Sequence, residues 1–496
     1  MIRRSLRVLR RAGLASPRAA VGLGAGLLAR AGGIDAVLRY AAVRHGRAPA
    51  ITDDTATVTY ADLARRVAEL TDGLRDTVDR GERAGVLIGN DIDAVTLLCA
   101  ASRLRLSVWP VDGRQPAPAV ARLAADHDWS VLLGTGLTPG VGETVRHTGH
   151  FQLLRRTAPP ERPDPHTLVV LTGGTTGVPK AAGRRPTATM MWAQFCALVD
   201  DVGLTRGGSS YIAAPLHHGF GLAALLTGLM LGAENQLSPR FDAETVAGTI
   251  RTRRPEVLVA VPTVLHRLVA HDARALDRVC TIVSGSAPLT GGLERAIRVT
   301  SDAHLFHLFG TSEGAFCALA TPEMLRTAPG TIGRPIPGAR MRVVDDEQVE
   351  VPDGVIGELQ VRSRAATSTS WISTGDRAHR VPHGLFHLDG RADDVVQSGG
   401  VSVAPAELER VLRTHDVVRD CAVVPVEDPE LGHRLAAFVV SEPGAAVDTD
   451  EVLRWLRERV THALLPRRLS ALSALPLTAA HKIDRRALSQ LAQRED

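Results

Sequence analysis

The chain has 496 residues, of which 44% are hydrophobic, 23% charged and 3% aromatic, and its formal net charge is +4. This length exceeds what one ordinary hydrophobic core accommodates, so we expect at least two domains, and the apolar content excludes a disordered chain. Dispersed arginines and scarce aromatic side chains argue against a nucleic-acid-binding platform, so no nucleic-acid partner is expected.

The five cysteines are odd in number and form no CxxC pair, so the sequence predicts neither a disulfide framework nor a zinc site. Free thiols indicate a reducing compartment, and we expect a cytoplasmic protein. The sequence contains no run of about 18 apolar residues, so no segment is predicted to span a bilayer.

Residues 1–34 combine a long basic start with a short apolar run from Val21 to Ala29. An export signal has the same order of regions, but here the basic part is long and glycines interrupt the apolar run. We interpret the segment as a basic amphipathic surface that contacts an anionic membrane peripherally, with an export signal as the alternative.

Residues 35–390 alternate helical and strand-like patterns. Apolar residues recur at helical spacing over 61–74, while 167–172 and 255–262 are short apolar runs with the length of buried strands. This alternation predicts a large α/β domain in which helices pack on β-sheets.

Residues 391–496 are predicted to form a separate small α+β domain. Helical patterns over 404–415 and 450–460 flank two strand-like runs, 421–428 and 434–442. The boundary is expected in a turn rich in glycine and aspartate near Asp393.

Lysine occurs at only two positions, Lys180 and Lys482, and the other 56 of the 58 basic residues are arginine. Codon bias explains why lysine is scarce, but it does not explain why lysine is found at these two positions. Because an ammonium is a compact point charge and a guanidinium a wide fork, we interpret both positions as sites that require the compact cation.

Lys180 ends the segment TGGTTGVPK, which we interpret as a phosphate cradle. Glycines permit a tight loop with inward N–H groups, and threonine hydroxyls add donors. The spacing is not that of a P-loop, and a flexible surface turn is the alternative. The residues expected to bind phosphate are Thr172, Gly173, Gly174, Thr175, Thr176, Gly177 and Lys180.

Eight further segments follow in one order along residues 35–490. They are PLHHGFG (215–221), SGSAPL (284–289), LFGTSEG (308–314), GTIGRPIPG (330–338), GELQV (357–361), STGD (373–376), GRADDVVQSGGVSVAPAELE (390–409) and HKIDRRAL (481–488). Together with the threonine-rich loop, they resemble the adenylate-forming superfamily, which includes acyl-CoA synthetases, peptide-synthetase adenylation domains and luciferases. The resemblance implies a large nucleotide-binding domain followed by a small mobile one.

The resemblance also implies roles for the motif residues. Glu313 with Thr176 would hold Mg²⁺ on the ATP phosphates and take part in catalysis, Phe309 would lie against adenine, and Asp376 would accept the ribose hydroxyls. The remaining nucleotide-binding residues implied are Gly285, Ser286, Ala287, Pro288, Gly310, Thr311, Ser312, Arg391 and Lys482.

Two more sites are implied for the acid and the thiol. His218, Gly219, Val261 and Pro262 would line an acyl pocket, although His218 could equally be a packed core histidine. Asp393 would be the hinge, and Ser398, Gly399 and Gly400 would line a coenzyme A channel. The sequence departs from the family at Gln397, where relatives commonly have lysine, and in the short region 362–372.

Lys482 matches the family's catalytic lysine, with His481 in place of the usual glycine. A mobile ammonium would offset the repulsion between a carboxylate and the α-phosphate of ATP while acyl-AMP forms. The small domain would then pivot and present residues 398–402 to the thiol.

The predicted function is therefore an AMP-forming carboxylate–CoA ligase that uses ATP, Mg²⁺ and coenzyme A, with a fatty or other apolar acid as substrate. An O-succinylbenzoate–CoA-ligase-like enzyme and an acyl-AMP ligase that loads a carrier protein are alternatives. GTSEG also fits G-x-S-x-G, so an α/β-hydrolase with Ser312 as nucleophile is a remote alternative.

Overall fold

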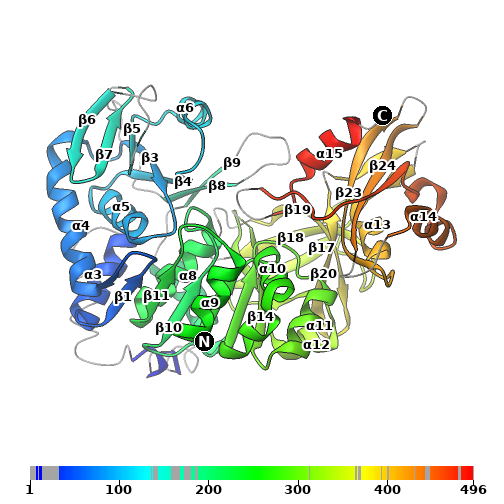
Figure 1. Cartoon of the computed structure of the whole chain (residues 1–496), viewed down its shortest axis with the longest axis horizontal. Helices are drawn as coiled ribbons and strands as arrows, with labels where there is room; N and C mark the ends of the chain where they lie inside the picture. The colour runs from blue at the N-terminus through cyan, green and yellow to red at the C-terminus, as the bar shows by residue number, and fades with distance from the viewer. Residues whose placement is uncertain are drawn as a thin grey trace.

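The protein is represented by a computed structural model. It describes residues 7–8, 10–13, 33–135, 137, 143–157, 168–172, 180–184, 188–311, 313–363, 366, 370–392, 394–398, 401–428, 431–441, 447–478 and 482–494. Three sheets organise these residues into a large α/β domain and a small α+β domain, which lie beside each other in Figure 1. The fold class predicted from the sequence is confirmed.

The largest sheet contains a parallel centre, β11 to β14, extended by antiparallel strands on one side. In spatial order its strands are β17 (Ala339–Val344), β18 (Gly357–Ser363), β19 (Ile372–Val381), β20 (Leu385–Arg391), β16 (Thr331–Pro335), β15 (Ala315–Ala320), β14 (His304–Thr311), β13 (Thr281–Gly285), β12 (Val257–Ala260), β10 (Ser209–Ile212), β11 (Glu234–Leu237), β1 (Pro49–Thr52) and β2 (Thr57–Thr59). The predicted strand at 255–262 is β12.

A second sheet of the large domain has a parallel core formed by β3, β4, β5 and β8. Its strands in spatial order are β6 (Glu143–Thr148), β7 (Phe151–Arg155), β5 (Val131–Thr135), β3 (Arg83–Ile88), β4 (Ser107–Asp112), β8 (Leu168–Thr172) and β9 (Lys180–Arg184). The third sheet belongs to the small domain and contains β22 (Val401–Val403), β21 (Val396–Ser398), β24 (Gly432–Ser441), β23 (Val418–Asp428) and β25 (Arg468–Ala471).

Helices cover these sheets. They are α3 (Ile34–His45), α4 (Tyr60–Leu74), α5 (Ile92–Arg103), α6 (Ala117–Asp126), α7 (Ala188–Asp201), α8 (Gly219–Leu231), α9 (Ala243–Arg253), α10 (Pro262–Asp272), α11 (Gly291–Thr300), α12 (Pro322–Thr327), α13 (Pro405–Leu412), α14 (Thr449–Arg457) and α15 (Arg485–Arg494), with short 3₁₀ turns η1 (Arg75–Thr77), η2 (Ala273–Arg278), η3 (Pro382–Gly384) and η4 (His462–Leu464). The helix predicted over 61–74 is α4, where the Thr59 hydroxyl accepts the Asp62 N–H as an N-cap.

Apolar clusters on both faces of the sheets hold the large domain together. The main cluster lies between the two sheets and joins strand residues such as Val86 and Val283 to α3, α4, α5 and α8. A second cluster packs α9, α10 and α11 on the opposite face of the largest sheet. A third packs α6 on the outer face of the second sheet, around Trp129. Burial on both faces explains why the central strands are continuous apolar runs.

The described part of the N-terminal segment packs on the large domain. Val8 and Ala12 are fully buried in the main cluster, and the Arg44 guanidinium donates to the carbonyl oxygens of Ala12 and Gly13. Arg11 and the Asp200 carboxylate lie 3.6 Å apart. The apolar side of these residues therefore faces protein, whereas the apolar run from Val21 to Ala29 lies outside the described residues. Among the helices that the structure describes, none is long and apolar enough to cross a membrane.

The two domains meet where β20 contacts α13. Gly390 has φ +120°, and a Cβ built on it would lie 2.7 Å from the Cβ of Ala406 in α13. Arg391 is the last residue of β20 and pairs with Asp376 across the ladder, so the large domain includes the residue at which the small domain was predicted to begin. Asp393, the predicted hinge, lies outside the described residues.

Candidate active site

The predicted acid- and nucleotide-binding residues follow the carboxyl ends of four neighbouring parallel strands. His218 comes after β10, Val261 after β12, Ser286 after β13 and Glu313 after β14. Parallel strands end at one edge of a sheet, and in α/β folds ligands bind at that edge. Residues from His218 to Glu313 are thereby brought to the carboxyl edge of the largest sheet.

Close packing at this edge requires glycine at two positions. A Cβ on Gly285 would lie 3.0 Å from the Leu308 carbonyl oxygen, and one on Gly310 would lie 2.5 Å from the Ala315 carbonyl oxygen. Ser286, which follows Gly285, is exposed with φ +68° and turns the chain toward Ala287 and Pro288. Phe309 is only 9% exposed and packs in an apolar cluster with Leu359 and Val361, so its ring presents little free surface to a nucleotide.

The turn that contains Glu313 and Gly314 connects β14 to the antiparallel strand β15. The Thr311 hydroxyl accepts the Gly314 N–H at 2.8 Å, and Glu313 lies half-buried in the turn. A nucleophile elbow needs a strand that turns into a helix. Because this turn joins two strands, the hydrolase alternative with Ser312 does not fit, although Ser312 itself lies outside the described residues.

His218 occupies the N-cap position of α8, directly before Gly219, and its side chain makes no capping hydrogen bond. Its ring centroid lies 4.3 Å from that of His217. Burial lowers the pKa of His218 to about 3 and that of His217 to about 4, so both imidazoles are neutral at pH 7. Nε2 of His218 is buried without a hydrogen-bond partner within the described chain, so the reading as a satisfied core histidine is not supported.

Asp376 and Arg391 form the predicted ribose pair. They are partners across β19 and β20, and Arg391 Nη1 lies 3.1 Å from Asp376 Oδ1 and 3.0 Å from the Thr374 carbonyl oxygen. Gly375 has φ +70°, and a Cβ there would lie 2.6 Å from Arg391 Nη2. The glycine of STGD thus makes room for the guanidinium that holds the carboxylate.

Lys482 projects from the small domain toward this site. Desolvation by surrounding protein lowers the pKa of its ammonium, although the residue keeps an exposed surface, and the charge of Asp376 opposes that shift. The charge of Lys482 in turn contributes to the lowered pKa of His218. One cation therefore interacts electrostatically with Asp376, the predicted ribose ligand, and with His218, a predicted residue of the acyl pocket.

The phosphate cradle is described only at its two ends. Thr172 ends β8, Lys180 begins β9, and the two residues are paired across that antiparallel hairpin. The predicted residues that lie outside the described chain are Gly173, Gly174, Thr175, Thr176, Gly177, Ser312, Asp393, Gly399, Gly400 and the motif residue His481. Ser398 ends β21 and is 4% exposed.

The described residues contain no cluster of three or more His, Cys, Asp or Glu arranged to hold a metal ion. Mg²⁺ in nucleotide sites is commonly held by one or two carboxylates together with substrate phosphates, so such a cluster is not required. Glu313, at the strand edge described above, fits the part of that single carboxylate.

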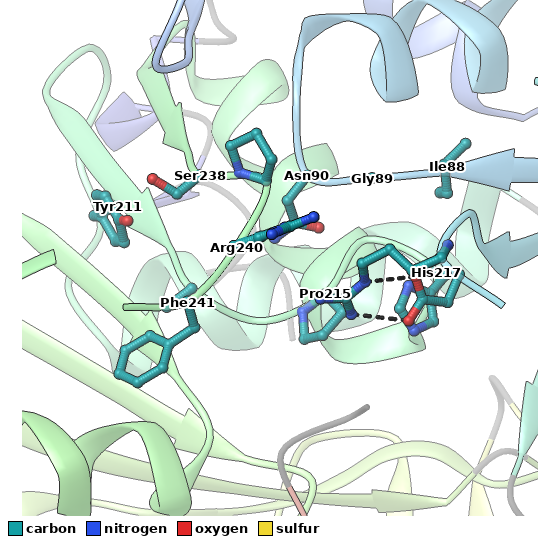
Figure 2. Close-up of a pocket in the computed structure, with 13 residues that line it drawn as sticks. Ile88, Gly89, Asn90, Tyr211, Pro215, His217, Ser238, Arg240 and Phe241 are labelled. Carbon is teal, nitrogen blue, oxygen red and sulfur yellow. Dashed lines mark hydrogen bonds and ion pairs between the residues drawn. The ribbon is translucent and has the colours of Figure 1, made fainter. Parts of the chain in front are cut away.

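A pocket lined by His217 lies between the two sheets of the large domain (Figure 2). His217, Asn90 and Arg240 line it, and Asn90 accepts the Leu216 N–H at 2.8 Å. Asp112 at the end of β4 also lines the pocket and forms a two-point ion pair with Arg114. The sequence did not single out these residues, because the pocket exists only once the two sheets pack together.

Comparisons with known proteins match almost the whole chain. Residues 38–371 match the family model of the AMP-binding enzyme, and residues 407–482 match its C-terminal domain. Feruloyl-CoA synthase from an Amycolatopsis species is 31% identical, covering 89% of this chain and 94% of the relative. 2-Succinylbenzoate–CoA ligase from Bacillus cereus is 27% identical, covering 88% and 94%. Among solved structures, the amide bond synthetase McbA from Marinactinospora thermotolerans has a TM-score of 0.77 at 25% identity, covering 92% and 100%.

Proposed function

The chain belongs to the AMP-binding enzyme family and is an AMP-forming acid–thiol ligase, and on that premise we propose that it joins an aromatic carboxylic acid to coenzyme A. The observation that carries the proposal is that Lys482 of the small domain lies within electrostatic range of Asp376 and of His218. This arrangement supports the acid-activating step, because a cation of the small domain lies within range of one residue proposed for the nucleotide and one proposed for the acid.

In the first step, a carboxylate oxygen bonds to the α-phosphorus of ATP while the bond from that phosphorus to the bridging oxygen breaks. Pyrophosphate leaves with the electron pair. Two anions must approach each other, and the Lys482 ammonium offsets their repulsion and the charge that builds on the phosphoryl oxygens. Asp376, oriented by Arg391, holds the ribose so that the reacting atoms stay aligned.

In the second step, the sulfur of coenzyme A bonds to the acyl carbonyl carbon, and the bond from that carbon to AMP breaks. The thiol proton passes to solvent and AMP leaves. We propose the pocket of Figure 2 as the approach path of the thiol, since it ends beside His217 and carries the cationic Arg240 suited to the phosphates of coenzyme A. Asp393, Ser398, Gly399 and Gly400 remain the proposed hinge and loop for this step.

An aromatic acid is favoured over the fatty acid expected from the sequence. The relatives are named for feruloyl, 2-succinylbenzoate and indoleacetate substrates, which all contain rings. Near His218, the partly buried Phe220 packs against both large clusters, and its Cε2 lies 3.3 Å from where a Gly285 Cβ would be. An aromatic wall at this place suits a flat substrate.

The proposal is tested by a panel of ferulate, indoleacetate, 2-succinylbenzoate and saturated fatty acids of several lengths. ATP-dependent pyrophosphate release is measured first without and then with coenzyme A, and thioester formation is measured separately. We expect turnover with a ring-containing acid that requires coenzyme A. Preference for a fatty acid would contradict the proposed substrate class, and acyl-AMP that persists when coenzyme A is added would favour a carrier-protein acceptor.

A further inference from the structure

We propose that Glu409 is a positioning residue for the activation step, because through Arg485 it fixes the tail segment that carries Lys482. This inference rests on the proposed function. Glu409 lies in α13 and its side chain is 6% exposed, while Arg485 begins α15. The two residues are separated by 76 positions, and both belong to the small domain.

The contacts of Glu409 use both carboxylate oxygens. Oε1 accepts the Val423 N–H at 2.9 Å and Arg485 Nη2 at 2.7 Å, and Oε2 accepts Arg413 Nη2 at 3.2 Å. Nη1 of Arg485 also donates to the Val423 carbonyl oxygen. The guanidinium is therefore held at two points, by the helix α13 and by the strand β23, which a lysine ammonium cannot reproduce.

Residues 476–478 and 482–484 pair as the stem of a short hairpin, which carries Lys482, while residues 479–481 lie outside the described residues. The Asp484 N–H donates to the Pro476 carbonyl oxygen at 2.8 Å, and the Thr478 N–H donates to that of Lys482 at 2.7 Å. Leu477 and Ile483 form an antiparallel bridge between these two bonds. Arg485 follows the hairpin directly, so its anchor on Glu409 fixes the hairpin stem to the body of the small domain.

This anchor matters for activation more than for thioester formation. A displacement of about 1 Å at a reacting group costs as much as 10²-fold in rate. Because Lys482 is carried by the hairpin stem, any tilt of that stem moves its ammonium. Formation of the thioester from acyl-AMP does not use the Lys482 ammonium in the mechanism above. Loosening the anchor should therefore slow one half-reaction and spare the other.

The test measures both half-reactions separately in the full-length chain. Activation is followed by ATP–pyrophosphate exchange with the fastest acid of the panel, and thioester formation by adding coenzyme A to the chemically prepared acyl-adenylate. We expect Glu409→Gln to lower kcat for exchange about tenfold, with KM for ATP nearly unchanged and thioester formation within about twofold of wild type. Arg485→Lys is the second variant and should behave alike, since it keeps the charge but loses one of the two anchoring bonds.

A double-mutant cycle identifies the route of the effect. In a Lys482→Ala background, Glu409→Gln should cause no further loss of exchange, because the group it positions is gone. Glu458→Gln, which removes the carboxylate of an exposed pair with Arg459 in the same domain, is the matched control and should change neither half-reaction.

Three outcomes would overturn the inference. They are equal losses in both half-reactions, a full loss from Glu409→Gln in the Lys482→Ala background, and wild-type exchange in both the Glu409 and Arg485 variants. If Lys482→Ala itself leaves exchange unchanged, the proposed activation mechanism fails first, so the two failures are distinguishable.

Discussion

The Lys482 ammonium and the Asp376 carboxylate belong to different domains, and each lies within range of the other's charge. Asp376 is fixed by Arg391 at 3.1 Å, and Lys482 is presented by a hairpin whose stem is hydrogen-bonded on both sides. The described geometry thus corresponds to a domain arrangement suited to activation of the acid.

Replacing Lys482 should abolish most of the activation rate. We expect Lys482→Ala to lower ATP–pyrophosphate exchange about 10²–10³-fold, the scale measured for loss of one transition-state donor. Lys482→Arg should be nearly as slow, because the planar fork is wider than the ammonium it replaces. Exchange at the wild-type rate in either variant would contradict the role given to Lys482.

The pKa of Lys482 should lie below that of a free lysine. Since the chain contains only two lysines, reductive methylation with ¹³C-formaldehyde labels Lys180, Lys482 and the chain terminus, and NMR can follow each signal against pH. Burial lowers the Lys482 pKa from 10.5, so deprotonation and loss of exchange activity should begin at lower pH than for an exposed lysine. Asp376→Asn removes the charge that opposes the shift and should lower this pKa further. A pKa of 10.5 or above would contradict the desolvated position.

Asp376 should confer recognition of the ribose hydroxyls. Hydrogen bonds to a charged group contribute about 1.5–3 kcal/mol, so Asp376→Ala should raise KM for ATP by about 10- to 100-fold. The wild type should discriminate against 2′-deoxy-ATP and 3′-deoxy-ATP, and the variant should lose most of that discrimination. Unchanged discrimination would place the ribose elsewhere.

His307 should make folding stability depend on pH. It is 2% exposed in β14, and burial lowers its pKa from 6.5 to about 4. Between these pH values the unfolded chain binds a proton that the folded chain excludes, so stability is full above pH 6.5 and falls as the pH decreases toward 4. The slope from this histidine approaches about 1.4 kcal/mol per pH unit. Between pH 7 and pH 5 the free energy of unfolding, measured with urea, should fall by about 2 kcal/mol less in His307→Gln than in the wild type, whereas an equal fall would contradict burial of a neutral imidazole.

Local patterns in the sequence were sufficient for the elements that are buried on both sides or strongly amphipathic. α4, β8, β12, β23 and β24 lie where periodicity predicted them. The strand-end positions of the motifs were also accessible, because a motif that directly follows a parallel strand must lie at the carboxyl edge of its sheet.

Contacts between distant segments could not be predicted in this way. The pocket beside His217 requires Asp112 and Arg240 from two separate sheets, and no local pattern records how those sheets pack. Glu409 and Arg485 both stand in recognised motifs, yet only the folded small domain brings them to 2.7 Å. Residues 1–34 were predicted to form an amphipathic surface, yet Val8 and Ala12 are buried in the main apolar cluster. The sequence could not indicate this contact, because the cluster is assembled from segments far along the chain.

Gly390 determines how closely β20 of the large domain packs against α13 of the small domain. A Cβ on Gly390 would lie 2.7 Å from the Cβ of Ala406, so β20 and α13 would have to move apart to accept a methyl group at this position. A methyl group added at Gly390, close to the predicted hinge, would rotate the small domain slightly. That rotation would displace the far end of the domain by a larger distance than it displaces the residues near the hinge. The position of the segment that carries Lys482 therefore depends on glycine at position 390.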